Sequence, residues 1–260
     1  MKQPFFSVVI PTLDEEKFLP NLLLDLESQS FGDFEVIHVD GISDDNTVAE
    51  AKKFSKKLDL VQLSTKVRSA SHQRNLGAEK SRGEWIIFID ADTRLAPHFM
   101  LVLRYRIAMS ERIKNPKDIA PPKTRFDVFT CLTALNNNDK KKTKHQITAR
   151  TINANLRSTA GSDNPVVLGA LLGIRASWFG AVRFDENAKF AEDRFFVRDL
   201  IAHGAKYKLL AKPTYHYSMR RWTDQNIVKS AAKNTFREFK LKFGDDYDEY
   251  DYQMLGGKAY

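Results

Sequence analysis

Short apolar runs alternate with amphipathic, helix-like segments along the first hundred residues of this chain, and this alternation restricts the fold more than any other feature. Four runs have the length and the aliphatic and aromatic content of strands: residues 6–10, 34–39, 60–63 and 85–89. Between the first two, leucines recur at helical spacing (Leu19, Leu22, Leu23 and Leu26). Strands joined by helices need crossover connections, which make them parallel. We therefore predict an α/β fold with a mostly parallel central sheet flanked by helices.

Polar and acidic residues stand directly after three of these four runs. Pro11-Thr12-Leu13-Asp14-Glu15 follows the first, Asp40-Gly41 the second, and Asp90-Ala91-Asp92 the fourth. The carboxyl ends of parallel strands share one edge of the sheet, where α/β proteins bind their ligands. Turn formation accounts easily for one acidic strand end, but less well for three on the same edge. We therefore expect a ligand site at this edge.

The pair Asp90 and Asp92 indicates a metal site. Alternate residues of an extended strand point the same way, so the two carboxylates can converge on one point. Oxygen ligands of this kind suit Mg²⁺ or Mn²⁺, with the remaining positions left to water and phosphate. A cation bridging a diphosphate would neutralise charge on a departing nucleotide.

Two further residues, Asp40 and Arg74, each have two interpretations. Asp40 either accepts a hydrogen bond from a nucleobase N–H or caps the turn at Gly41. Arg74 either holds phosphate or ribose with its planar fork of donors or is an exposed helix arginine.

Four blocks, residues 7–16, 34–45, 73–77 and 83–92, resemble glycosyltransferase family 2, the inverting transferases with the GT-A fold. The resemblance covers the first hundred residues in family order. It implies a Rossmann-like GT-A fold with a smaller acceptor-side region. Two departures concern base and ribose recognition: the family's usual Asn is Asp14, and its Asp-Asp-Gly-Ser reads Asp40-Gly41-Ile42-Ser43.

The resemblance also implies roles for individual residues. Thr12, Glu15 and Asp40 line the nucleoside pocket, Arg74 approaches the base or phosphates, and Asp92 ligates the metal. The complete predicted nucleotide-binding set is Pro11, Thr12, Leu13, Glu15, Asp40, Arg74, Asp90 and Ala91.

The second half of the chain matches the family at a few places. Phe190-Ala191-Glu192-Asp193-Arg194 looks like its acidic pair at the start of the acceptor-side helix. An inverting transfer needs a base to take the proton of the acceptor hydroxyl, and a carboxylate can do this. By resemblance this base is Asp193, with Glu192 as second choice. The alternative is helix capping, because acids favour a helix N-terminus.

Three later residues are further candidates. His216 either completes the metal shell or holds the diphosphate, or it is a packed strand histidine. Residues 218–222 are similar to a Gln-x-x-Arg-Trp signature of polymerising relatives, with Ser218 in place of Gln. We expect no processive synthesis, and assign Arg220 or Arg221 to a phosphate of the donor or the acceptor.

Charge and cysteine content indicate partners and location. The net charge of +8 and pI near 9.4 attract phosphate-bearing partners such as nucleotides, nucleic acid or an anionic membrane face. The single cysteine, Cys131, fits a reducing compartment, and no apolar run has the length of a bilayer span. We expect a cytoplasmic protein, with peripheral contact at the inner face of the membrane as a variant.

We predict four regions: a nucleotide-sugar-binding half at 1–113, a partly mobile insertion at 114–165, an acceptor and catalytic half at 166–223, and a C-terminal helix with an acidic tail at 224–260. The C-terminal helix and tail are the segment through which a homodimer can form. The predicted function is metal-dependent, non-processive transfer of a sugar from a nucleoside-diphosphate donor, a UDP-sugar first, to a hydroxyl of a glycan or lipid-linked acceptor. The alternatives are transfer to a polyprenyl phosphate at the membrane, a nucleic-acid-binding protein, and an inactive scaffold. Acidic strand ends disfavour nucleic acid, because they repel its backbone.

Overall fold

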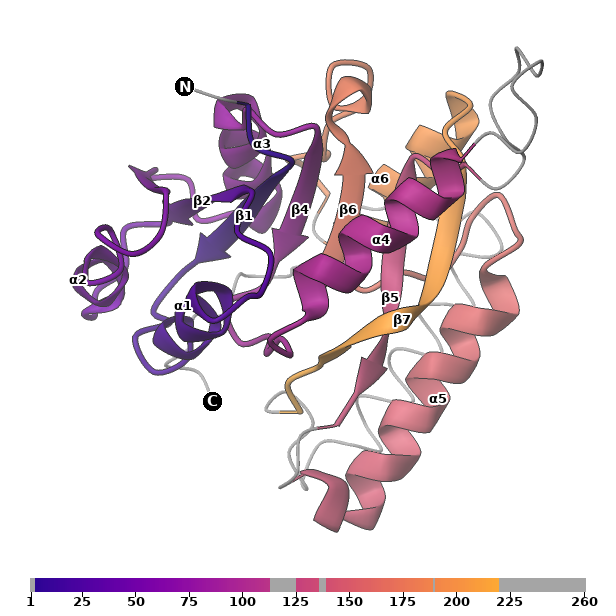
Figure 1. Ribbon diagram of the computed structural model, residues 1–260, viewed down its shortest axis with the longest axis horizontal. Helices are drawn as coiled ribbons and strands as arrows, with labels where there is room; N and C mark the ends of the chain where they lie inside the picture. The colour runs from indigo at the N-terminus through magenta and orange to yellow at the C-terminus, as the bar shows by residue number, and fades with distance from the viewer. Residues whose placement is uncertain (1–2, 113–124, 136–138, 189, 220–260) are drawn as a thin grey trace.

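A seven-stranded sheet forms the centre of the computed structural model, which describes residues 3–112, 125–135, 139–188 and 190–219 (Figure 1). The strand order across the sheet is β3-β2-β1-β4-β6-β5-β7. The strands are β1 Phe6–Thr12, β2 Phe34–Asp40, β3 Leu60–Ser64, β4 Trp85–Ile89, β5 Val128–Ala134, β6 Leu171–Arg175 and β7 Tyr207–His216.

The sheet is mostly parallel, as predicted. Strands β3, β2, β1 and β4 are parallel neighbours, and β5 is parallel to β7. Strand β6 runs antiparallel to both β4 and β5 and so joins the two parallel groups. In the register, Thr12 is opposite Asp40, so β1 and β2 end at the same level.

Helices cover both faces of the sheet (Figure 1). The helices are α1 Leu19–Glu27, α2 Thr47–Lys52, α3 Ala70–Lys80, α4 Phe99–Glu111, α5 Thr143–Thr159 and α6 Glu192–Ala202, with short 3₁₀ turns η1 Asp139–Lys141 and η2 Ala176–Trp178. Alternate strand residues divide the core in two. Val8 and Ile10 pack with α1 and α4 on one face, whereas Val9 and Phe88 pack with α3 and α6 on the other. None of the helices in the described ranges is both long and apolar enough to span a membrane.

The range predicted as an insertion contains two regular elements. Strand β5 lies between β6 and β7, and six of its seven residues are buried. A strand that is buried on both faces shows no alternation of apolar and polar residues, which explains why its pattern is weak. Helix α5 packs beside β5, where the Asn153 side chain exchanges hydrogen bonds with the backbone of Thr133.

The second half of the sheet contains one long strand, β7, and a short one, β6, that begins at Leu171. The C-terminal helix and acidic tail predicted at 224–260 lie outside the described residues. The four-region division of the chain stays a prediction.

Candidate functional site

Hydrogen bonds join the loop after β1 to the loop after β2. The backbone N–H of Asp14 donates to Ser43 Oγ (2.8 Å), and that of Asp44 donates back to Asp14 Oδ1 (2.8 Å). The N–H of Glu15 donates to Thr47 Oγ1 (2.8 Å). Glu15 is buried. The two loops therefore form one connected edge at the carboxyl ends of β1 and β2.

The Asp40 side chain closes the turn after β2. Its carboxylate accepts from the N–H of Ser43 (2.8 Å), from Ser43 Oγ (2.6 Å) and from Thr12 Oγ1 (3.1 Å). Thr12 Oγ1 also lies 2.8 Å from His38 Nε2. Burial lowers the pKa of His38 to about 4, although Asp40 acts in the opposite direction. His38 is therefore neutral at pH 7. The contacts of Asp40 are those of a residue that caps the turn, which is one of its two predicted roles; its contact with a nucleobase stays a prediction.

Arg74 connects the end of β4 to the start of α6. Its Nη2 lies 3.0 Å from Asp90 Oδ1, and its Nη1 lies 2.8 Å from Glu192 Oε1. The side chain is 4% exposed, so the alternative of an exposed helix arginine is wrong. Burial alone would lower the pKa of Arg74, but the carboxylates of Asp90 and Glu192 raise it by more. The pKa of Arg74 is therefore above its ordinary value.

Asp193 lies beside this ion-pair cluster, in the first turn of α6. A Cβ built on Gly169 would be 2.9 Å from Arg74 Nη2 and 3.2 Å from Asp193 Oδ2, so both side chains border the same glycine. Burial raises the pKa of Asp193 to about 7; Glu192 adds to the increase, and Arg74 opposes it. Glu192 is paired with Arg74, whereas Asp193 Oδ1 accepts from the adjacent backbone N–H of Arg194 (2.8 Å). At neutral pH, therefore, Asp193 can either hold or release a proton.

Residues in left-handed backbone conformation surround the same edge. Within the described ranges the non-glycine residues with positive φ are Asp14 (54°), Ile42 (56°) and Ala191 (53°). They follow β1, follow β2 and precede α6, respectively. Such conformations cost on the order of 1 kcal/mol or more each, and they concentrate at functional sites. The edge is thus strained where the predicted ligand residues lie.

Asp92 and His216 lie on segments that pair through their backbones. Arg94, two residues after Asp92, exchanges both backbone hydrogen bonds with His216 (3.2 and 2.9 Å). His216 Nδ1 is buried and has no hydrogen-bond partner among the described residues, so this nitrogen can serve as a ligand. In the part of the chain described, no three His, Cys, Asp or Glu side chains are gathered to hold a metal. The assignment of Asp92 and His216 to a metal stays a prediction; it requires a cation that takes its other ligands from phosphate and water.

The remaining predicted residues are buried or not described. Pro11, Leu13 and Ala91 are buried. Arg220 and Arg221 lie outside the described residues, and their assignment to phosphate stays a prediction.

Sequence reasoning missed two buried polar groups at this edge. Gln73 Nε2 donates to Thr12 O (2.8 Å), and a Cβ on Gly41 would be 2.9 Å from this nitrogen, whereas Gln73 Oε1 has no partner in the described ranges. The Tyr215 hydroxyl is likewise buried and unpaired there, and burial raises its pKa well above the ordinary value. Helix α3 is the feature that points to Gln73, because its buried residues are mostly polar or small. No feature of the sequence points to Tyr215.

Comparison with known proteins finds similarity to glycosyltransferases. The sequence model described as glycosyl transferase family 2 matches residues 7–108. Over 226 residues the chain is 25% identical to the poly(ribitol-phosphate) beta-N-acetylglucosaminyltransferase TarS of Staphylococcus aureus. That match covers 83% of this chain and 36% of the relative, so the chain spans about a third of the relative's length.

Solved structures show the same architecture. The crystal structure of S. aureus TarS 1–349 in complex with UDP has a TM-score of 0.63 at 21% identity, covering 82% of this chain and 60% of that one. The mannosyltransferase PcManGT from Pyrobaculum calidifontis, in complex with GDP-Man and Mn²⁺, has a TM-score of 0.61 at 15% identity, covering 84% and 58%. The fold predicted from the resemblance, GT-A, is confirmed.

Proposed function

We propose that this chain, whose residues 7–108 match the model of glycosyl transferase family 2, is an inverting, metal-dependent glycosyltransferase of that family that moves one sugar per cycle from a nucleoside-diphosphate donor to an acceptor hydroxyl. The observation that carries the proposal is the position of Asp193. This carboxylate lies beside the Arg74–Asp90 ion pair at the carboxyl end of β4, where the family binds its donor.

Asp193 is the proposed general base. It takes the proton of the acceptor hydroxyl as that oxygen bonds to the anomeric carbon; the bond from this carbon to the diphosphate oxygen breaks, and the nucleoside diphosphate leaves. A base works best when its pKa is near the working pH, and the pKa of Asp193 is raised to about 7. Glu192 is the weaker candidate because it is already paired with Arg74.

The donor is proposed to be a UDP-sugar. TarS of S. aureus was solved with UDP, and PcManGT with GDP-Man and Mn²⁺. Asp92 and His216 would hold Mn²⁺ or Mg²⁺, which neutralises charge on the leaving diphosphate when bound. Thr12, Glu15 and Asp40 line the nucleoside pocket in this proposal.

Two arginine sites complete the assignment. Arg74 is a positioning residue, because both of its terminal nitrogens are bound to carboxylates. Arg220 and Arg221 are proposed to pair with phosphate of the donor or the acceptor.

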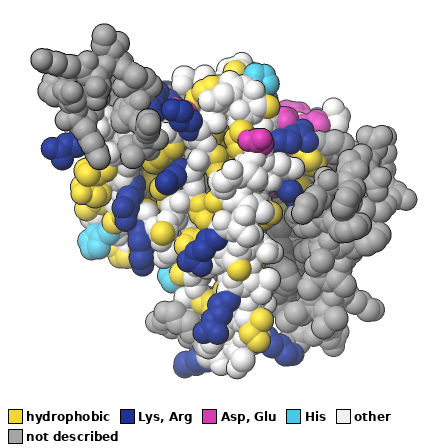
Figure 2. All heavy atoms as spheres, turned by 90° about the vertical axis from the view of Figure 1, so that its right-hand side faces the viewer, with side chains coloured by type: hydrophobic (Ala, Val, Ile, Leu, Met, Phe, Trp, Pro, Cys, Tyr) yellow, Lys and Arg dark blue, Asp and Glu magenta, His cyan; other side chains and the backbone are white. Residues whose placement is uncertain are grey.

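Surface charge favours a phosphate-bearing acceptor. The chain has no Asp or Glu between residues 140 and 162, and five exposed cations lie on or next to α5: Lys141, Lys142, Lys144, Arg150 and Arg157. Lys and Arg side chains outnumber Asp and Glu on the face of the molecule that Figure 2 shows. The similar protein TarS is named for a poly(ribitol-phosphate) acceptor. Transfer to a polyprenyl phosphate at the membrane surface is the second candidate, because the same cations would contact that phosphate.

A donor screen tests the proposal. The purified chain is incubated with Mn²⁺ and a panel of UDP-, GDP- and dTDP-sugars, and thermal stabilisation and nucleotide release are measured. We expect one UDP-sugar to stabilise the chain only with the cation and to release UDP when an acceptor is added. Activity that requires detergent and a prenyl phosphate would select the second candidate. No metal-dependent binding of any nucleotide sugar would refute the transferase proposal.

A further inference from the structure

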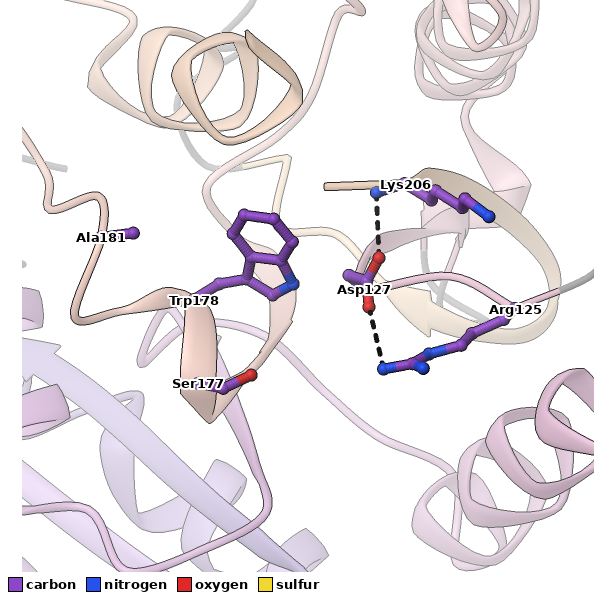
Figure 3. A pocket seen from close by; sticks show the side chains of 6 residues that line it. All are labelled: Arg125, Asp127, Ser177, Trp178, Ala181 and Lys206. Atoms are coloured by element: carbon purple, nitrogen blue, oxygen red, sulfur yellow. Dashed lines mark hydrogen bonds and ion pairs between the residues drawn. The ribbon is translucent and has the colours of Figure 1, made fainter. Parts of the chain in front are cut away.

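A pocket of about 470 Å³ lies beside the turn η2 and the residues that precede β5 and β7 (Figure 3). Six residues line it: Arg125, Asp127, Ser177, Trp178, Ala181 and Lys206. In the antiparallel pair of β4 and β6, Arg175 is opposite Trp85, the first residue of β4, so the residues after Arg175 lie at the amino end of β4. Asp90 follows the other end of this five-residue strand, roughly 16 Å away at about 3.3 Å per residue. The pocket is therefore separate from the candidate site.

The positive charges of the pocket are only partly neutralised. The one carboxylate of the lining, Asp127, accepts from the backbone N–H of Lys206 (3.1 Å), and its Oδ1 lies 3.7 Å from Arg125 Nη2 and 3.6 Å from Arg175 Nε. The ammonium of Lys206 has no ion pair within the described ranges, and Figure 3 shows it directed away from Asp127. Arg125 Nε is buried and lacks a hydrogen-bond partner there. The pocket therefore has an excess of cationic donors.

An aromatic ring forms the opposite wall. In Figure 3 the indole of Trp178 stands between Ala181 on one side and Asp127 and Arg125 on the other. Trp178 is only partly buried. Sites for small ligands combine such an apolar surface with a few polar groups that fix orientation. An indole face suits the C–H face of a sugar ring, and the guanidinium fork suits phosphate or carboxylate.

We propose that this pocket binds an anionic sugar, whose ring stacks on Trp178 and whose phosphate or carboxylate pairs with Arg125 and Lys206. As part of the proposed function, the natural ligand would be a unit of the acceptor glycan remote from the reacting hydroxyl. The pocket would then hold the acceptor while its end reaches Asp193.

Direct binding tests this proposal without donor or metal. The full chain is labelled at its indole nitrogens, and the Trp178 N–H signal, identified by its loss in Trp178→Phe, is followed by NMR. The probes are glucose 6-phosphate, glucuronate, glucose and inorganic phosphate at matched ionic strength. We expect saturable shifts of the Trp178 signal with glucose 6-phosphate or glucuronate, and at least tenfold weaker binding of glucose and of phosphate. The stronger of the two anionic sugars identifies the anionic group.

Variants separate the pocket from other sites. Arg125→Gln should weaken binding of the anionic sugar about tenfold, Arg125→Lys should restore most of it, and Lys206→Ala should weaken it severalfold. The matched control is Lys57→Ala, an exposed lysine paired with Glu27, which should change nothing. Absence of saturable shifts, or shifts unaffected by Arg125→Gln and Lys206→Ala, would overturn the inference. An inactive chain that still binds the probe would refute the transferase proposal only, and an active chain without binding would refute the pocket only.

Discussion

The two halves of the sheet achieve their geometry differently. On the β1–β4 side, neighbouring parallel strands end at the same level, and their loops bond to one another, as Asp14 does to Ser43 and Asp44. On the β5–β7 side, the antiparallel strand β6 connects β4 to β5, and the proposed base, Asp193, lies in the first turn of α6. The first side is organised by local loop contacts, whereas the second depends on contacts between distant parts of the chain.

Arg74 is where the two sides meet. Its guanidinium binds Asp90 of the first side and Glu192 of the second, which are 16 and 118 residues away along the chain. Gly169 leaves the space in which Arg74 and Asp193 approach. In the proposed function, the first side fixes the donor, while the second side supplies the proton acceptor.

The largest expected effect separates these two roles at Asp193. Asp193→Asn keeps the shape but cannot accept a proton, so we expect transfer to fall about 10³-fold, within the range for a general base. Donor affinity, measured by calorimetry with UDP and Mn²⁺, should change less than threefold. Asp199→Asn, at a later position of α6, is the matched control and should retain full activity. Near-normal turnover of Asp193→Asn would show that the base is another residue.

Removing Arg74 should break the connection between the sides. Arg74→Met leaves Asp90 and Glu192 without their buried partner, and losing one member of a buried ion pair costs about 3 kcal/mol or more. Urea denaturation measures the free energy of unfolding. The control Arg183→Met removes an exposed pair with Glu79 and should cost less than about 0.5 kcal/mol. Equal losses in the two variants would mean that Arg74 is not the connecting residue.

Asp92 tests the donor side. Asp92→Ala should weaken donor binding on the order of 10²-fold when Mn²⁺ is present and should reduce turnover with it. Without metal, the variant and the wild type should bind UDP equally weakly, because the carboxylate acts through the cation. A variant whose affinity for UDP still rises with added Mn²⁺ would contradict the assignment of Asp92.

Much of the first side could be predicted from sequence, because period-two and helical patterns together with strand-end acids are local signals. The acids predicted to share an edge do lie at or directly after the ends of the parallel strands β1, β2 and β4. Strand β5 was harder because burial on both faces removes its alternation. The unpaired Gln73 Oε1 and Tyr215 hydroxyl depend on which distant groups surround them, and no local pattern encodes this. The same holds for the pairing of Arg74 with Glu192.

The pH dependence of transfer should sharpen the role of the second side. Burial raises the pKa of Asp193 from 3.8 to about 7, so below pH 7 the carboxyl is protonated and cannot act as a base. We expect kcat/KM to fall about fivefold between pH 7 and pH 6 and to level off above pH 8.

Protein stability should respond to the same ionisation. Because the native pKa of Asp193 is above the unfolded one, the folded state binds its proton more tightly. The stability that this proton contributes is complete below about pH 4 and is lost as the pH rises through 7. Urea midpoints between pH 5 and 8 should fall less steeply with rising pH in Asp193→Asn than in the wild type. Identical slopes would place the pKa of Asp193 near its ordinary value.

The smallest expected effect concerns the strain of the first side. Ile42 has φ of 56°, a conformation that costs an L-residue roughly 1–2 kcal/mol, at the position where the family pattern has glycine. The side chain is 45% exposed, so Ile42→Gly loses little apolar burial and should raise the free energy of unfolding by about 1 kcal/mol. Val67→Gly, at a similarly exposed loop residue without positive φ, is the control and should lower it by up to about 1 kcal/mol. If both variants lose stability alike, the strain at Ile42 is offset by contacts of its side chain, and the loop after β2 is held by more than its hydrogen bonds.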